Sequence, residues 1–340
     1  MSYGTAVEIG SPRDTLQYVR RTMIPWPQWD LVADSVAKRL AAARPDLRGP
    51  GLQAPALAAA LASLKESAVA ALGQVLAPAQ TDEIAAYLRA QPGFAGHHMT
   101  SSDGRERPYA DIVAEGGRYV AYRPETVVKA PHAMALANRP EILDLVEAAL
   151  GCPPTLYSVS AWWSFPVAGE PWPPHSQHFH RDDDDFRFFT LFVYLTDVDS
   201  EFDGPNQIVP GSHTLAGMNA LIADAATAGR LVPDQAMVNN LLTQWPQPTT
   251  LVENAFAPRI VSTLGPRGTG FFADTRTLHR GFQPRERVRG ILWFRFGLGP
   301  NSNSSDVDLV DGPVPVAAVG SAIPDTPRHR YVNRLLVRWD

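Results

Sequence analysis

The residues best suited to metal chemistry lie in one short stretch that contains His175, His178, His180 and a run from Asp182 to Asp185. Alternate side chains of a β-strand share one face, so His180 and Asp182 would point the same way and could bind one ion. An imidazole and a carboxylate with open coordination positions suit iron(II). His178 would share that face and is a rival ligand. The His-x-Asp motif alone is also compatible with a surface ion pair or a hydrogen bond at a strand edge.

A further histidine, His279, follows His180 after ninety-nine residues, in the segment FFADTRTLHRG of residues 271–281. The segment predicts a strand that ends in a turn, and a core histidine capped by Asp274 is the alternative interpretation of His279. Ten residues later, Arg289 opens the apolar run GILWF. An arginine at the start of a barrel strand can hold a dicarboxylate through paired hydrogen bonds. Arg287 shares its strand face and is the rival, and a solvated basic loop is the alternative for Arg289.

The order of these motifs resembles the phytanoyl-CoA dioxygenase family. Between the two histidine segments lies DGPNQIVPGSH (residues 203–213), and LFVYLTDVD (residues 191–199) resembles a core strand of that family. The resemblance covers about residues 78–298. It implies a double-stranded β-helix, with iron(II) held by His180, Asp182 and His279. It also implies that the co-substrate 2-oxoglutarate binds Arg289 through its distal carboxylate, and that O2 is the oxidant.

One position departs from the family pattern. Members often have a hydroxyl residue two positions after the distal histidine, and this chain has Gly281 there. The second anchor of 2-oxoglutarate is therefore open. Gln177, three residues before His180, is an alternative contact near the iron.

Helical periodicity dominates the first part of the chain, and residues 1–92 are predicted to form a helical N-terminal region packed on the core. The pattern predicts helices over residues 30–43 and 54–77, the second ended by Pro78. Thr81 is predicted to cap a third helix through Arg89. A further helix is predicted over residues 139–150, ended by Gly151.

From residue 155 onward, β-branched and aromatic runs alternate with turn residues. Strands are predicted over residues 155–163, 187–195, 207–209, 270–272 and 291–296. Short strands with long connections favour a jelly roll, so the fold class is mainly β with α: a cupin-like, double-stranded β-helix core over residues 93–298. A helical insertion is predicted at about residues 215–242, and residues 299–340 are predicted to be a loop-rich C-terminal tail.

Several other polar and aromatic residues have a structural interpretation. The run from Asp183 to Asp185 is expected to form a solvated turn, or else to accept a hydrogen bond from a histidine. His213, after Pro-Gly-Ser, is expected to be structural. Cys152, beside prolines, is expected to be inert. Aromatic side chains are expected to fill the barrel core, with a pocket lining as the alternative; they are Trp162, Trp163, Phe165 and Trp172.

The composition of the 340-residue chain is that of a globular protein, with 45% hydrophobic and 19% charged residues. A net charge of −5 makes nucleic acid a poor partner. The first ten residues lack the pattern of a signal peptide, and no apolar run is long enough to span a membrane. The single cysteine fits a reducing compartment. We therefore expect a soluble, cytoplasmic protein with a small-molecule substrate; its oligomeric state stays open.

The sequence thus predicts an iron(II)- and 2-oxoglutarate-dependent oxygenase. The resemblance implies hydroxylation of an unactivated C–H bond in a small metabolite or natural-product intermediate, with succinate and CO2 as co-products. One alternative is a cupin-like metalloenzyme that does not use 2-oxoglutarate. The other is a jelly-roll protein that binds a sugar or a partner without catalysis.

Overall fold

Two antiparallel sheets form the centre of the molecule. The computed structural model describes residues 24–96, 104–166, 177–234, 238, 241, 249–299 and 312–339. Within these ranges eight strands form a large sheet in the order β1-β9-β6-β11-β5-β4-β2-β3, and three form a small sheet in the order β10-β7-β8. The strands of the large sheet are β1 (Val69–Gln74), β2 (Pro92–Phe94), β3 (Glu106–Pro108), β4 (Tyr119–Ala121), β5 (Thr155–Ser164), β6 (Phe188–Tyr194), β9 (Thr269–Ala273) and β11 (Arg289–Gly297). Those of the small sheet are β7 (Asn206–Ile208), β8 (Val261–Thr263) and β10 (His279–Gly281).

The central strands are apolar on both faces because both faces of the large sheet are covered. On β11, Leu292, Phe294 and Phe296 pack into the core that the sheet shares with the helices. Ile291 and Trp293 point to the other face, into an aromatic cluster on the side of the small sheet. The five predicted strands correspond to β5, β6, β7, β9 and β11, and their bounds agree to within two residues at each end.

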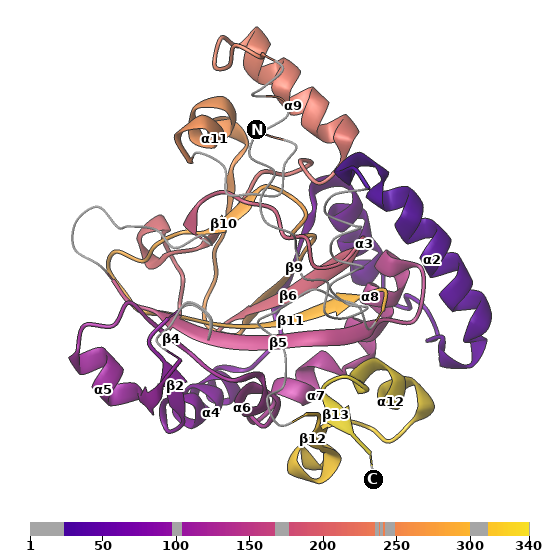
Figure 1. Cartoon of the computed structure of the whole chain (residues 1–340), viewed down its shortest axis with the longest axis vertical. Helices are drawn as coiled ribbons and strands as arrows, with labels where there is room; N and C mark the ends of the chain where they lie inside the picture. Colours follow the sequence, from indigo (N-terminus) through magenta and orange to yellow (C-terminus); the bar gives the residue numbers. More distant parts are fainter. Residues whose placement is uncertain are drawn as a thin grey trace, which may run out of the picture.

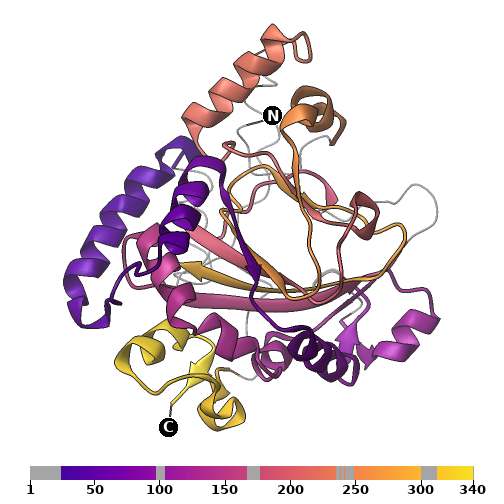
Figure 2. The ribbon, with the colours of Figure 1, turned by 180° about the vertical axis from the view of Figure 1, so that it is seen from behind.

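Helices cover the outer face of the large sheet. Helices α4, α6 and α7 lie along this face, and β10 lies on the opposite side (Figure 1). The view from behind shows the same layers, with the first two helices beside one end of the sheet (Figure 2). The helices of this part are α2 (Trp29–Ala43), α3 (Pro55–Ser67), α4 (Pro78–Arg89), α5 (Tyr109–Ala114), α6 (Pro124–Val128), α7 (Ala133–Ala137) and α8 (Pro140–Leu150), with short 3-10 turns η2 (Trp26–Gln28) and η3 (Pro45–Leu47).

The N-terminal helices are confirmed at two places and wrong at a third. Helices α2 and α8 match the predictions over residues 30–43 and 139–150 to within one residue. The helix predicted to extend to residue 77 ends at Ser67, and Ala68 adopts a left-handed φ of 68°. The next six residues form β1, because pairing with β9 overrides their helical pattern. Pro78 begins α4 instead of ending the previous helix, and Thr81 lies inside that helix.

Two later segments add helices outside the large sheet. Helix α9 (Leu215–Thr227) lies in the predicted insertion, and α11 (Thr249–Phe256) follows it, with η6 (Glu201–Asp203) before and η7 (Ala257–Arg259) after the pair. The two helices share a second apolar core with Phe179, Val209 and Leu278, beyond the small sheet (Figure 1). The other described residues of the insertion are 228–234, 238 and 241.

The C-terminal segment is more ordered than predicted. Its described residues form β12 (Val314–Pro315), η8 (Val316–Ala318), η9 (Gly320–Ala322), α12 (Pro327–Asn333) and β13 (Val337–Arg338). The prediction of a loop-rich tail is wrong for residues 312–339, because Val332 and Leu336 are buried in the main core. The polar run at residues 301–305 and Trp172 lie outside the described residues. None of the helices in the described ranges is both long and apolar enough to cross a lipid bilayer.

Candidate metal centre

The two candidate histidine ligands face each other across a pair of backbone segments. The backbone N–H of His180 donates to the backbone carbonyl of His279 at 2.9 Å, and the backbone N–H of His279 donates to the carbonyl of His180 at 3.0 Å. This isolated antiparallel bridge extends the edge of the small sheet beyond β10. The ring centroids of the two imidazoles are 4.3 Å apart. Backbone pairing therefore brings together two residues that are far apart in the chain.

The carbonyl oxygen two residues before each histidine sets the tautomer of its imidazole. Nδ1 of His180 lies 2.8 Å from the carbonyl oxygen of His178, and Nδ1 of His279 lies 3.0 Å from that of Thr277. A carbonyl oxygen only accepts, so each Nδ1 must carry the proton and donate it. In the neutral imidazole, Nε2 is then left with the lone pair, which is the form that binds a metal.

Asp182 completes the cluster. Its Oδ1 lies 3.6 Å from Nε2 of His180, and its Oδ2 lies 3.6 Å from Nε2 of His279. Its backbone N–H donates to the carbonyl of Thr275 at 2.8 Å, so the loop before His279 also positions this carboxylate. The three potential ligand atoms all lie within 4.8 Å of one another. Two neutral imidazoles and one carboxylate form the donor set typical of non-haem iron(II) sites, so the residues fit this metal.

The charges around the cluster favour its metal-binding form. Burial, with a smaller contribution from His180, lowers the pKa of His279 to about 4, so this imidazole is neutral at pH 7. Burial alone would raise the pKa of Asp182, but the neighbouring Arg295 leads the interactions that outweigh it and hold that pKa below its usual value. An ionised carboxylate beside the neutral imidazole of His279 is ready to bind a cation.

The rival residues lie in other contacts. Nδ1 of His178 is 3.0 Å from the hydroxyl of Thr249 in α11, and His178 is not part of the three-residue group. Asp274 binds Arg276 and does not cap His279, so the alternative of a capped core histidine is wrong. Nε2 of His213 lies 3.2 Å from the carbonyl of Lys65, as expected for a structural histidine.

Arg289 is a buried cation that meets no carboxylate among the described residues. Only 2% of its surface is exposed. Its Nη1 donates to the carbonyl of Gly204, its Nη2 donates to the hydroxyl of Ser164 at 3.1 Å, and its Nε has no partner in the described part of the chain. Burial lowers its pKa from the ordinary value. A buried guanidinium that binds only neutral oxygens is suited to an anionic ligand.

Arg287 differs from Arg289 although it is only two residues away. Its guanidinium binds Asp203 at 2.5 Å and Asp199 at 3.1 Å, and 48% of its side chain is exposed. Hydrogen bonds from Arg287 and Ser200 lower the pKa of Asp203 to about 2. Arg287 therefore already has two carboxylate partners, one of them buried, and its own side chain is half exposed.

Gly281 connects Arg289 to the metal cluster. A Cβ atom at Gly281 would lie 3.2 Å from Nη2 and 3.3 Å from Nη1 of Arg289. Gly281 is two residues after His279 on β10, and two residues of extended strand span about 6.6 Å. The guanidinium of Arg289 therefore lies beside the strand that begins with His279.

Gln177 lies in a buried group of amides rather than among the three potential ligands. Its Nε2 donates to Oε1 of Gln283, which also accepts from the hydroxyl of Tyr119 at 3.1 Å. Nε2 of Gln283 donates to the carbonyl of Phe165 at 2.9 Å. Oε1 of Gln177 is buried and has no hydrogen-bond partner among the described residues. Tyr119 pairs across the sheet with Ser164, and the hydroxyl of Ser164 accepts from Arg289. This group of amides therefore lies next to Arg289.

Arg295 is a residue that the sequence analysis did not single out. Its Nη2 donates to Oδ2 of Asp182 at 2.7 Å, and its Nη1 donates to Asp184. Asp184 also accepts from the hydroxyl of Tyr157 at 3.0 Å. The expected solvated turn is wrong for Asp184 and Asp185, which are 7% and 8% exposed. Neither accepts from a histidine in the hydrogen bonds of the described residues.

The aromatic residues divide between the two faces of the sheet. Trp162 packs edge-on against Trp293 on the inner face, with ring centroids 6.1 Å apart. Trp163 lies on the outer face and donates to the hydroxyl of Tyr122 at 2.9 Å, so its role is in the core. Cys152 is also in this core, and burial raises the pKa of its thiol to about 12, which agrees with an inert side chain.

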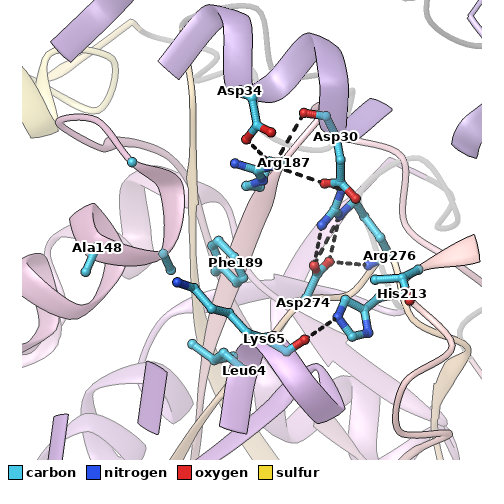
Figure 3. A pocket seen from close by; sticks show the side chains of 13 residues that line it. Asp30, Asp34, Leu64, Lys65, Ala148, Arg187, Phe189, His213, Asp274 and Arg276 are labelled. Atoms are coloured by element: carbon cyan, nitrogen blue, oxygen red, sulfur yellow. Dashed lines mark hydrogen bonds and ion pairs between the residues drawn. The ribbon is translucent and has the colours of Figure 1, made fainter. Parts of the chain in front are cut away.

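A second group of charged residues lies beside helix α2 and lines a cavity of about 350 Å³ (Figure 3). Arg276 binds Asp274 at 2.5 Å and Asp30 at 2.9 Å, and Arg187 binds Asp30 at 3.2 Å and Asp34 at 2.8 Å. We name these five residues the α2 ion-pair cluster. The cluster ties α2 to the loop that carries Thr275 and Thr277, whose carbonyls hold Asp182 and His279.

A β-sandwich with two imidazoles and one carboxylate at its edge belongs to the class of double-stranded β-helix metalloenzymes. The family model for phytanoyl-CoA dioxygenase (PhyH) matches residues 69–285, which is more than half of the chain. The chain therefore belongs to the PhyH family, and its enzyme class is that of the 2-oxoglutarate-dependent non-haem iron oxygenases. No match was found among curated protein sequences.

Several solved structures have a similar fold at low sequence identity. HygX from Streptomyces hygroscopicus, with nickel, 2-oxoglutarate and hygromycin B bound, is 14% identical with a TM-score of 0.46, over 74% of this chain and 92% of that one. The epimerase SnoN, in complex with Fe3+, alpha ketoglutarate and nogalamycin RO, is 18% identical with a TM-score of 0.45, over 71% and 83%. EctD from S. alaskensis, with 2-oxoglutarate and 5-hydroxyectoine, is 15% identical with a TM-score of 0.44, over 86% and 92%. At TM-scores below 0.5, these similarities do not bear on the substrate of this chain.

Proposed function

We propose that this chain catalyses the iron(II)- and 2-oxoglutarate-dependent hydroxylation of an unactivated C–H bond in a small metabolite or natural-product intermediate. In this reaction the substrate, 2-oxoglutarate and O2 give the hydroxylated substrate, succinate and CO2. The observation that supports it most is the convergence of His180, Asp182 and His279 within 4.8 Å in a member of the PhyH family.

The proposed roles follow from the contacts of each side chain. When bound, iron(II) with 2-oxoglutarate and O2 supplies the oxidising chemistry. His180 and His279 offer their Nε2 atoms, because each Nδ1 donates to a carbonyl oxygen. Asp182 offers an ionised carboxylate oxygen. Arg289 is proposed to pair with the distal carboxylate of 2-oxoglutarate, which would supply the anion that the buried guanidinium lacks.

Two further features are proposed to orient the bound molecules. The hydroxyl of Ser164 accepts from Arg289, so its own proton is available for the same carboxylate. Oε1 of Gln177 can accept a hydrogen bond from a bound molecule, because it has no described partner. The aromatic inner face around Trp162 and Trp293 excludes water and strengthens charge pairing nearby.

An anaerobic titration tests this proposal directly. Purified protein is loaded with Fe(II) without oxygen and titrated with 2-oxoglutarate, and the visible spectrum is recorded. We expect a metal-to-ligand charge-transfer band that saturates with 2-oxoglutarate, followed by succinate release when O2 and a pool of metabolites are added. Iron binding without the band would instead support a metalloenzyme that does not use 2-oxoglutarate. Failure to bind iron would support a non-catalytic jelly roll.

A further inference from the structure

We propose that Arg295 and Asp184 form a positioning pair for the metal centre. Arg295 holds one oxygen of Asp182, so that the other oxygen is presented to the cation, and Asp184 cancels the positive charge that Arg295 brings. The proposal rests on the function proposed above, since it takes Asp182 as a metal ligand. It adds roles for two residues outside the three-residue group.

The first step is the geometry of the contact with Asp182. Nη2 of Arg295 donates to Oδ2 of Asp182 at 2.7 Å, a charge-assisted hydrogen bond of good length. Oδ1 of the same carboxylate lies 3.6 Å from Nε2 of His180, while Oδ2, besides its contact with Arg295, lies 3.6 Å from Nε2 of His279. A carboxylate with one oxygen held by a guanidinium offers the other oxygen to a metal ion. Without Arg295, Asp182 could rotate or bind through both oxygens and take a coordination position that the co-substrate needs.

The second step is the rigidity of Arg295. Its guanidinium lies 4.6 Å from the ring centroid of Trp293, two residues earlier on the same face of β11. Its Nη1 donates to Asp184, and the hydroxyl of Tyr157 donates to that carboxylate at 3.0 Å. The side chains of Arg295 and Asp184 are 15% and 10% exposed. A side chain fixed by stacking, strand geometry and a hydrogen-bonded partner can hold a ligand in one orientation.

The third step is the local charge. An unpaired guanidinium next to Asp182 would repel a divalent cation bound there. The repulsion would be strong because little water screens the charges in this region. Arg295 and Asp184 together have no net charge, so the pair can position Asp182 while the negative charge of Asp182 stays available to the cation.

The test separates position from charge by comparing Co(II) binding in three variants of the full chain. Arg295→Gln combined with Asp184→Asn keeps the local net charge of the native protein but removes the contact with Asp182. We expect its dissociation constant for Co(II) to rise about 10- to 100-fold, the range for residues that orient metal ligands. We also expect its visible Co(II) spectrum to change, because the orientation of Asp182 changes. Asp184→Asn alone keeps the contact, so it should weaken binding without changing the spectrum.

A matched control is available near the C-terminal helix. Arg328 is shared by Asp144 and Glu147, and its side chain is 14% exposed, so it resembles Arg295 in burial and in its partners. Arg328→Gln combined with Asp144→Asn should leave the affinity and spectrum of Co(II) unchanged. An equal loss of Co(II) affinity in this control would overturn the proposal, because the effect would then be general destabilisation.

Two results would contradict the positioning role. One is native affinity and a native spectrum in the Arg295→Gln/Asp184→Asn protein. If that protein does not fold, Arg295→Lys replaces it, since lysine keeps the charge but cannot span both carboxylates; a native Co(II) spectrum in Arg295→Lys is the second contrary result. If the native chain itself binds no Co(II), the proposed function fails, which is distinguishable from failure of this inference alone.

Discussion

Two groups of charged residues meet at the loop of residues 274–279, and they differ in whether every guanidinium binds a carboxylate. In the α2 ion-pair cluster, both guanidiniums bind carboxylates of the same cluster (Figure 3). At the metal centre, three acceptor groups converge, and Arg289 meets no carboxylate among the described residues. Buried charges cost free energy unless they are compensated. The α2 ion-pair cluster is therefore balanced by its own charges, whereas Arg289 lacks a counter-charge among the described residues; the three candidate ligands and Arg289 are here called the incomplete group.

The largest expected effect comes from removing the carboxylate of Asp182 at the metal centre. Asp182→Ala leaves two neutral imidazoles, so we expect Fe(II) affinity to fall more than about 100-fold, beyond the range for residues that only orient ligands. The charge-transfer band with 2-oxoglutarate and substrate-dependent succinate formation should both disappear. Asp34→Ala removes a carboxylate from the α2 ion-pair cluster, where 68% of the side chain is exposed, and should leave both unchanged. Native turnover in Asp182→Ala, with iron and ascorbate supplied, would remove this residue from the metal site.

The next effect compares the unpaired arginine with its paired neighbour. Arg289→Ala should weaken 2-oxoglutarate binding by about 2–4 kcal/mol, the usual loss when one partner of a buried charge pair is removed. The measurement is the concentration of 2-oxoglutarate that gives half of the charge-transfer band. Arg287→Ala should leave that concentration unchanged, because Arg287 is bound to Asp203 and Asp199 at the surface. A loss confined to Arg287→Ala would mean that the dicarboxylate binds the other arginine.

A smaller effect is expected at Gly281, which leaves open the space in front of Arg289. An added Cβ would lie 3.2 Å from Nη2 of Arg289, so the guanidinium would have to move by a few tenths of an ångström. We expect Gly281→Ala to weaken 2-oxoglutarate binding about 10-fold, a fraction of the loss of a full charge pair. Gly281→Ser should recover part of this loss through its hydroxyl. Tighter binding of 2-oxoglutarate to Gly281→Ala would show that the space in front of Arg289 is too wide for the dicarboxylate.

The sequence predicts the members of the incomplete group better than their surroundings. His180, Asp182, His279 and Arg289 stand in an ordered set of motifs. The expected strand through His180 and Asp182 is wrong, because His180 forms only an isolated bridge with His279 and Asp182 is positioned by the hydrogen bond from its backbone N–H to Thr275. Arg295 also carries a sequence signal, because it is six residues after Arg289 and shares its face of β11. Its contact with Asp182 depends on how β11 passes the loop of residues 180–185, which spacing along the chain does not give.

Other errors arise where distant partners override a local pattern. Four consecutive aspartates indicate a solvated turn, but Asp185 is buried because the N–H groups of Phe186 and Leu298 donate to its carboxylate. Strand β1 was assigned to a helix because its partner, β9, lies about two hundred residues later in the chain. Composition and periodicity do not contain such contacts, so they indicate which candidate ligands converge better than they indicate which residues position them.

The smallest expected effect tests whether the paired cluster is only structural. Asp30→Asn removes one carboxylate between Arg276 and Arg187. Because 43% of the Asp30 side chain is exposed, solvent screens these pairs, and we expect a loss of about 1 kcal/mol or less in the free energy of unfolding at pH 7. Fe(II) and 2-oxoglutarate affinities should stay at their native values. A large loss of Fe(II) affinity would instead mean that α2 holds the loop of residues 274–279 in its metal-binding form.

The pH dependence of this loss gives an independent check on its electrostatic origin. Burial raises the pKa of Asp30, but Arg276 and Arg187 outweigh it and lower that pKa below the ordinary value of 3.8. The folded state therefore binds fewer protons than the unfolded state, so Asp30 stabilises the fold above pH 3.8 and loses this contribution as the pH falls through its folded pKa. The free energies of unfolding in urea of the native and Asp30→Asn proteins should differ most near pH 7. They should converge as the pH falls below the folded pKa of Asp30. A difference that is constant down to acid pH would show that Asp30 acts through packing, since a change that removes no charge interaction has no reason to follow the titration of a carboxyl group.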